Sequence, residues 1–253
     1  MKATELLLPT LSFLLSSTVI QAGEEVARLL KEYGQIKTVT CQIRRTKSGE
    51  TGKMRFLSRV YWAKDDKIHA EGIAPFKRRT IADGKRLYQY VDGSPKGFSR
   101  TIGELSKPML ISLRFVPGTA MDHLLRLVDT KESVLPPKGE AVKRTGIETE
   151  KNYVVLSFDA QDRLVSIEFF KTSAMKTLNG AYQYRDFSEM IPGVWVPQTH
   201  EVVVQSPKMN FKEVVKVDRF IANKPVPESL FIASRFFDKD IDFVDDFAKI
   251  LPE

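Results

Sequence analysis

Residues 80–93 read TIADGKRLYQYVDG, in which two runs of β-prone residues meet at Asp83-Gly84. An Asp-Gly pair tolerates positive φ and suits a tight turn between two antiparallel strands. A second pair of this kind, Asp92-Gly93, ends the second run. The stretch therefore predicts an antiparallel β-hairpin with its turn at Asp83-Gly84, and this role explains Asp83 better than a catalytic one.

The chain before this hairpin also reads as strands. Residues 36–46 alternate apolar and polar side chains, as a half-buried strand does, and residues 53–63 and 68–73 continue the pattern. In 53–63 the alternation places Met54, Phe56, Val60 and Trp62 on one face, and Arg55 and Arg59 on the other. We expect the first face to line the concave side of a sheet.

The remaining segments complete a mainly β chain with short helices. One helix is expected at about 24–33, and two helical runs, 104–113 and 120–127, are separated at Pro117-Gly118. Further strands are expected at 141–147, 153–158, 164–171, 181–187, 195–205 and 211–220. Turn residues at these intervals indicate an antiparallel meander in one large domain, because the helix and strand alternation of a parallel sheet is absent.

The N-terminal segment resembles an export signal. An apolar run from Leu6 to Ile20 follows Lys2, and Ala22 precedes the polar Gly23-Glu24-Glu25. This order predicts a signal peptide at 1–22, cleaved after Ala22, and a periplasmic mature chain; an uncleaved anchor is the alternative. Because Cys41 is the only cysteine, the chain has no internal disulfide and relies on its core for stability.

Composition and motifs favour binding over catalysis. The net charge of +7 comes without blocks of Lys and Arg, so a nucleic-acid partner is not expected, whereas acidic lipid headgroups or an acidic partner stay compatible with it. His69, His123 and His200 lack metal-ligand spacing, and no nucleophile or phosphate-binding motif is present. We therefore predict no catalytic residue, no metal and no cofactor.

Two phrases carry a family resemblance. ADGKRLYQY at 82–90 is similar to the "SDGKTLWFY" hairpin of the LolA/LolB-like family, and PMLIS at 108–112 resembles its "PFMLIA" phrase. That family comprises periplasmic carriers and receptors of outer-membrane lipoproteins. The resemblance implies a curved antiparallel sheet, an incomplete β-barrel with a helical lid over an apolar cavity, at residues 23–232.

The resemblance also implies the binding residues. The cavity would be lined by Met54, Phe56, Val60, Trp62, Ile68, Met109, Leu110 and Ile111. Where the family's carrier has an Arg-Pro pair whose arginine holds the lid shut, this chain reads Lys64-Asp65, so Lys64 is either a lid contact or an ordinary exposed turn lysine. The helices around PMLIS are equally compatible with a lid and with plain core helices.

The function implied is a non-enzymatic carrier. It would bind the acyl chains of lipoproteins, or another lipid, and move them toward the outer membrane as a monomer, between an inner-membrane releasing complex and an outer-membrane receptor. The alternative is an envelope sensor or protein-binding module of the same fold. The tail at 233–253 has apolar residues among aspartates and is expected to form a short amphipathic helix on the outside, or an interaction arm.

Overall fold

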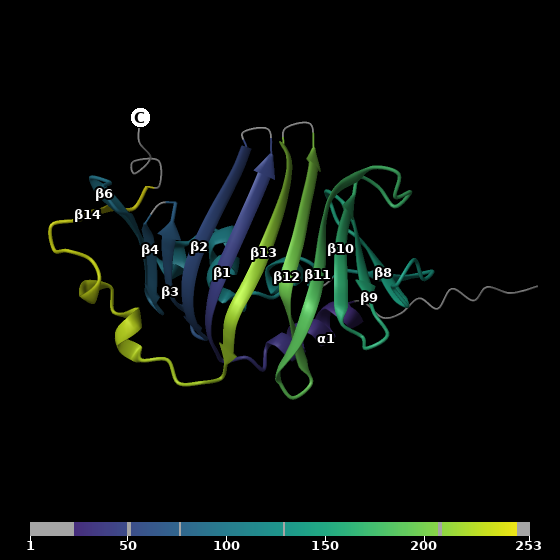
Figure 1. Cartoon of the computed structure of the whole chain (residues 1–253), viewed down its shortest axis with the longest axis horizontal. Coiled ribbons are helices and arrows are strands. Elements are labelled where there is room, and N and C mark those ends of the chain that lie inside the picture. Colours follow the sequence, from purple (N-terminus) through teal and green to yellow (C-terminus); the bar gives the residue numbers. More distant parts are fainter. Residues whose placement is uncertain (1–22, 50–51, 76, 129, 207–208, 247–253) are drawn as a thin grey trace, which may run out of the picture.

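The computed structural model describes residues 23–246 except 50–51, 76, 129 and 207–208. The expected signal peptide at 1–22 and the end of the tail, 247–253, lie outside the described residues. The described chain forms one curved 14-stranded sheet (Figure 1). Across the sheet the strands follow the order β14-β6-β5-β4-β3-β2-β1-β13-β12-β11-β10-β9-β8-β7. The mainly β, antiparallel fold class predicted from the sequence is confirmed.

Two groups of strands meet where β1 pairs with β13. The first group is β1 (Thr38–Gly49), β2 (Gly52–Ala63), β3 (Lys67–Ala74), β4 (Arg78–Asp83), β5 (Arg86–Val91) and β6 (Lys96–Thr101). The second group is β7 (Glu132–Leu135), β8 (Lys143–Glu148), β9 (Tyr153–Phe158), β10 (Leu164–Phe170), β11 (Leu178–Ile191), β12 (Val194–Ser206) and β13 (Met209–Ala222). Because β1 joins β13 in an antiparallel ladder, the N-terminal and C-terminal strands form one continuous surface.

The hairpin quoted at the outset is confirmed. Strands β4 and β5 pair antiparallel up to Ala82 and Leu87, and Gly84 has a φ of 91°. The Asp83 carboxylate accepts hydrogen bonds from the backbone N–H groups of Lys85 and Arg86, both at 2.8 Å. Asp83 is thus a turn residue, as its sequence position indicates.

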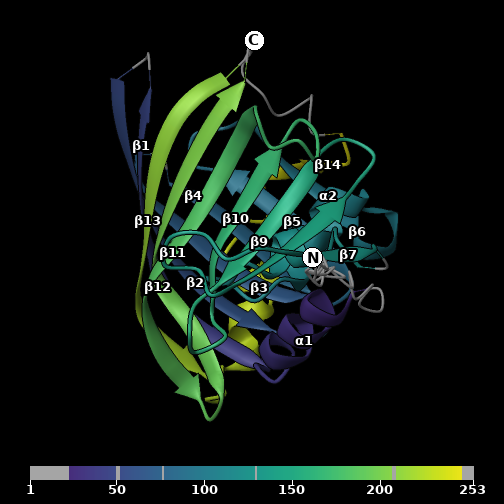
Figure 2. The ribbon, with the colours of Figure 1, turned by 90° about the vertical axis from the view of Figure 1, so that its right-hand side faces the viewer.

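Short helices cover the concave side of the sheet (Figure 2). These are α1 (Glu24–Tyr33), the 3-10 turn η1 (Ile102–Glu104), α2 (Lys107–Arg114) and α3 (Met121–Leu124). All three helices were expected, although α2 and α3 are shorter than the helical runs in the sequence. The buried Glu132 carboxylate fixes the start of α1, since it accepts hydrogen bonds from the N–H groups of Glu25 and Val26 at 3.1 Å each.

The main core lies between these helices and the sheet. On β1 and β2 the register pairs Val39 with Trp62 and Cys41 with Val60, and all four side chains are buried. Burial raises the pKa of the Cys41 thiol to about 12, so it stays protonated at neutral pH. No helix in the described ranges is both long and apolar enough to cross a membrane.

The expected helix in the tail is wrong for the part of the tail that is described. After the 3-10 turns η2 (Glu228–Phe231) and η3 (Ala233–Arg235), residues 242–244 form β14, a short strand parallel to β6. Aromatic packing explains the extended form, because Phe243 lies against Tyr88 and against Phe237, with ring centroids 5.5 and 5.2 Å apart. A Cβ at Gly97 would stand 2.5 Å from the Phe243 ring, so this glycine makes room for the tail.

Candidate ligand-binding pocket

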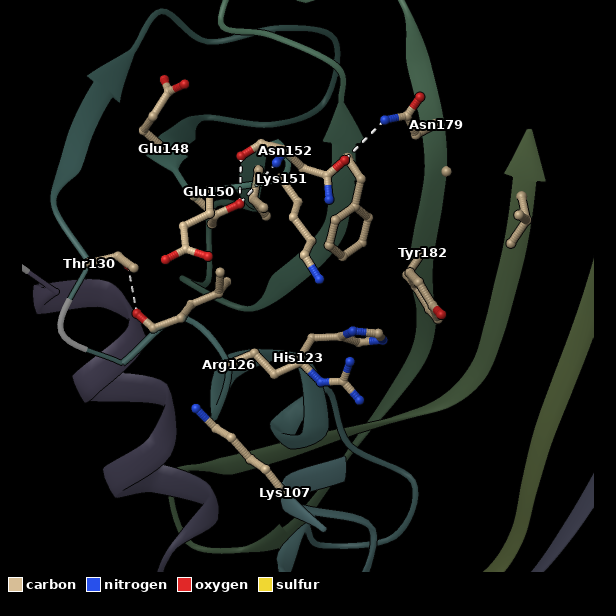
Figure 3. Close-up of a pocket in the computed structure, with 16 residues that line it drawn as sticks. Lys107, His123, Arg126, Thr130, Glu148, Glu150, Lys151, Asn152, Asn179 and Tyr182 are labelled. Carbon is tan, nitrogen blue, oxygen red and sulfur yellow. Dashed lines mark hydrogen bonds between the residues drawn. The ribbon is translucent and has the colours of Figure 1, made fainter. Parts of the chain in front are cut away.

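An open pocket of about 880 Å³ lies on the concave side, between strands β9–β12 and the helical segment that contains α2 and α3 (Figure 3). Its volume falls in the range of sites that hold small ligands. The strands supply the floor, the segment around α3 supplies one wall, and the loop between β8 and β9 supplies the rim.

The floor of the pocket is one row of side chains across four strands. The register aligns Val154 on β9 with Phe169 on β10, Phe169 with Gly180 on β11, and Gly180 with Val204 on β12. Residues in register on neighbouring strands point to the same face. Gly180 contributes no side chain, so the row has a gap between Phe169 and Val204, and all four residues of the row line the pocket.

Three rings in tilted and edge-to-face contact form the inner wall. The His123 ring lies 4.2 Å from the Tyr182 ring and 5.7 Å from the Phe169 ring, centroid to centroid. Phe169 and Tyr182 are half-buried and also pack against the main core. Their exposed faces, together with Val204 and the edge of Leu127, give the pocket an apolar interior.

His123 is held uncharged at neutral pH. Burial lowers the pKa of its imidazole below the ordinary value, and the nearby Arg126 charge lowers it further, while Asp122 acts in the opposite direction. Burial likewise raises the pKa of the Tyr182 phenol. The His123–Tyr182 pair is therefore a neutral surface suited to apolar contacts.

The rim is fixed by hydrogen bonds within the loop between β8 and β9. The Thr149 hydroxyl donates to the Asn152 carbonyl at 2.7 Å and accepts from the Asn152 N–H at 3.0 Å. The Asn179 amide donates to the Asn152 side-chain oxygen at 3.0 Å, which ties the loop to β11. These bonds preorganise a polar mouth above the apolar floor.

None of the eight cavity residues expected from the sequence lines this pocket. Val60 and Trp62 belong to the main core, and the Trp62 indole N–H donates to the Leu113 carbonyl of α2 at 2.7 Å. Trp62 is 3% exposed. Its edge also lines a smaller hollow of about 380 Å³ beside the end of α1.

The other expected cavity residues lie on α2, on β3 and in the first half of β2. Ile68, Met109 and Leu110 pack against a second core cluster that contains Leu87 and Phe98, and Ile111 is half-buried on α2. Phe56 is half-buried and Met54 is 40% exposed, toward the turn between β1 and β2. Arg55 and Arg59 are exposed. The eight residues therefore do not converge on the pocket near Gly180.

Lys64 lies at the end of α1. Its ammonium donates to the Gly34 carbonyl at 2.6 Å, where it partners one of the last carbonyls of that helix. In the next turn Asp66 contacts α2, accepting hydrogen bonds from the Arg114 guanidinium at 2.8 and 2.9 Å. The turn after β2 thus contacts both the end of α1 and the end of α2.

Phe169, Gly180, Tyr182 and Val204 were not identified from the sequence. Their alternation within strands indicated an inward face, but a strand pattern does not show which inward residues remain uncovered. The one local signal is the Asn179-Gly180 pair, which lies within β11, where a glycine marks close approach or missing side-chain volume.

Comparisons with known proteins identify the fold. The sequence matches no family model and none of the curated proteins. Among solved structures, a domain described as an outer-membrane lipoprotein-sorting protein from Vibrio parahaemolyticus is similar with a TM-score of 0.56 and 10% identity, over 83% of this chain and 95% of that chain. A LolA superfamily protein from Nitrosomonas europaea has a TM-score of 0.53 and 12% identity, over 83% and 99%. A DUF1329 family protein from Desulfovibrio piger has a TM-score of 0.55 and 10% identity, over 85% and 97%.

At these identities the likeness establishes the fold alone. The described chain has the LolA-like architecture of a curved sheet with short helices on its concave side, as the hairpin and the PMLIS phrase predicted.

Proposed function

We propose that this chain, which has the LolA-like fold, binds the acyl chain of a lipid or of a lipoprotein in the pocket at Gly180 and carries it toward the outer membrane. The single observation that carries the proposal is the gapped row Val154–Phe169–Gly180–Val204, an apolar floor left open beneath a fixed polar rim.

The energetics support an acyl ligand. Each methylene moved from water to an apolar surface contributes about 0.8 kcal/mol, so a chain of several methylenes supplies the binding free energy without any bond being made or broken. The exposed ring faces of Phe169 and Tyr182 give that chain a surface to lie on. The polar rim keeps the mouth hydrated, and the headgroup can stay in water there.

The carrier role and its place in the cell belong to the same proposal. The solved structures of similar fold include a protein described as lipoprotein-sorting, and the N-terminal sequence has the order of a cleavable signal. In this account the mature chain begins at Gly23, works in the periplasm, and receives and delivers its ligand at an inner-membrane complex and an outer-membrane receptor. N-terminal sequencing of the protein from an envelope fraction tests the first step, and a chain that keeps residues 1–22 contradicts it.

Binding is tested on the delipidated protein with a fluorescent fatty acid. We expect saturable binding with one ligand per chain, and a reduction of about tenfold or more in affinity for Val204→Trp, because the indole occupies the gap beside Gly180. Val142→Trp, the same change at an exposed position away from the pocket, is the control and should bind as the wild type does. Absence of saturable binding by the folded wild-type protein would contradict the proposal and favour the protein-binding module of the same fold.

A further inference from the structure

Three cationic side chains converge on the mouth of the Gly180 pocket from separate segments. Lys107 begins α2, Arg126 follows α3, and Lys151 comes from the loop between β8 and β9. Figure 3 shows Lys151 pointing down toward the region of His123 and Arg126, while Lys107 approaches from the opposite side. We call these three residues the cation cluster.

The cation cluster has no carboxylate partner among the described residues. Other partly buried cations of the fold do have carboxylate partners: Lys143 contacts Glu25 and Asp162, and Arg144 contacts Glu168. Glu148 and Glu150 also line the pocket; in Figure 3 Glu148 points away from Arg126 and His123, and neither carboxylate forms an ion pair with the cation cluster among the described residues. Three cations in one pocket that form no ion pair provide a site for an anion.

The cluster stands directly beside the apolar floor. Arg126 is close enough to His123 and Tyr182 for its charge to act on both rings, which lie on the wall of the pocket. A ligand whose acyl chain lies along Phe169 and Val204 therefore places its headgroup among Lys107, Arg126 and Lys151. Apolar surface and unpaired positive charge within one pocket match an amphiphile with a negative head.

We infer that the ligand is an anionic amphiphile, one acyl chain joined to a phosphate or carboxylate headgroup, and that Lys107, Arg126 and Lys151 recognise that headgroup. This inference rests on the proposed function and adds the charge of the ligand to it. The guanidinium of Arg126 offers two parallel donors to such a group, and the two lysines add point charges around it.

The test compares two lysolipids that share one acyl chain. Lysophosphatidylglycerol has a net negative charge and lysophosphatidylcholine has none, and each is titrated below its micelle concentration into the delipidated full chain. We expect lysophosphatidylglycerol to bind about tenfold more tightly, with the difference shrinking as salt is added. The double variant Arg126→Gln/Lys151→Gln should bring lysophosphatidylglycerol to the affinity of lysophosphatidylcholine, whose own binding stays unchanged.

The matched control is Arg55→Gln/Lys53→Gln, which removes the same two kinds of charge at exposed positions on β2. It should preserve the preference, which separates local recognition from the net charge of the protein. Equal binding of the two lysolipids by the wild type, or a preference unaffected by Arg126→Gln/Lys151→Gln, would overturn the inference while the acyl carrier stands.

Other outcomes act on the proposed function itself. If neither lysolipid binds, the carrier fails and the inference fails with it. Inorganic phosphate is the remaining probe: binding of phosphate alone, with no lysolipid bound, would make the cluster a phosphate site and overturn both proposals.

Discussion

Two regions of one concave face differ in what covers them. Around Trp62 the sheet is filled: Val39, Cys41 and Val60 surround the indole, and α2 supplies a carbonyl for its N–H. Around Gly180 the sheet is open, because the row of side chains has a gap and α3 ends at Leu124. Both regions come from strands whose inward faces contribute apolar residues to the main core.

The difference shows that a strand pattern indicates which side chains face inward, but not whether other side chains or helices cover them. A large side chain whose polar atom finds a partner closes one region, whereas a missing side chain in register leaves the other region open. In the proposed function, acyl binding therefore depends on the glycine in the row more than on the largest apolar residues.

The largest expected effect concerns the filled region. Trp62→Ala should lower the free energy of unfolding by about 3–5 kcal/mol, because a buried ring is lost and a cavity remains. Trp62→Phe should cost about 1–3 kcal/mol, since the Leu113 carbonyl loses its donor. Urea denaturation measures both values. A cost below about 1 kcal/mol for Trp62→Ala would contradict a filled region. Trp62→Phe should bind an acyl ligand as the wild type does, because Trp62 does not line the Gly180 pocket.

One substitution made in both regions sharpens the comparison. Val60→Trp should destabilise the protein by about 1–3 kcal/mol or more, because Val60 is enclosed by packed side chains. Val204→Trp should leave stability within about 0.5 kcal/mol of the wild type, because the added indole enters existing space. Thermal and urea unfolding of the two variants, side by side, decide this. Equal destabilisation by both would show that the Gly180 pocket is not open space.

Acid should weaken the fold through His200, which is buried on β12 against Tyr184. Burial lowers the pKa of its imidazole, and its Nε2 lies 3.1 Å from the Gly118 carbonyl and 3.3 Å from that of Pro197, so the neutral ring donates there. Since the unfolded chain takes up the proton first, the contribution of His200 is complete above its ordinary pKa of about 6.5 and is lost as the pH falls from there through the folded-state pKa.

The measurement is the unfolding free energy at several pH values between neutral and acid. His200→Gln, which keeps a donor, should reduce the fall in stability without abolishing it, because burial also lowers the pKa values of His69 and His123. An unchanged pH dependence in His200→Gln would contradict this assignment.

The smallest expected effect is at the contact between Arg114 and Asp66, which joins α2 to the turn after β2. Arg114 is largely exposed, so a double-mutant cycle with Arg114→Gln and Asp66→Asn should give a coupling energy of about 0.2–1 kcal/mol. The variants should leave equilibrium acyl affinity near that of the wild type, because neither residue lines the Gly180 pocket. A coupling energy of several kcal/mol would make this contact a main support of the covered region.

Much of the fold was predictable from local chemistry. Asp83-Gly84 fixed the hairpin because its backbone requirement is local, and the 24–33 helix followed from its apolar spacing. The tail was misjudged because its apolar spacing suits a helix, whereas its conformation is decided by Tyr88 and Gly97, which lie far away in the sequence.

The pocket was less predictable, for a related reason. Trp62, Met109 and Leu110 are conspicuous in the sequence, yet a partner on a distant element decides whether each is covered. Gly180 becomes informative only when the register places it between Phe169 and Val204, and register across four strands is a tertiary property.

The most direct test of the account maps where an acyl chain lies. The delipidated protein is loaded with a fatty acid carrying a photoreactive diazirine on its chain, irradiated, digested, and the modified peptides are identified by mass spectrometry. The account predicts adducts on the segments that contain Val154, Phe169, Tyr182 and Val204, and their loss in Val204→Trp. Adducts confined to residues 54–62 of β2 or to α2, and retained in Val204→Trp, would contradict it.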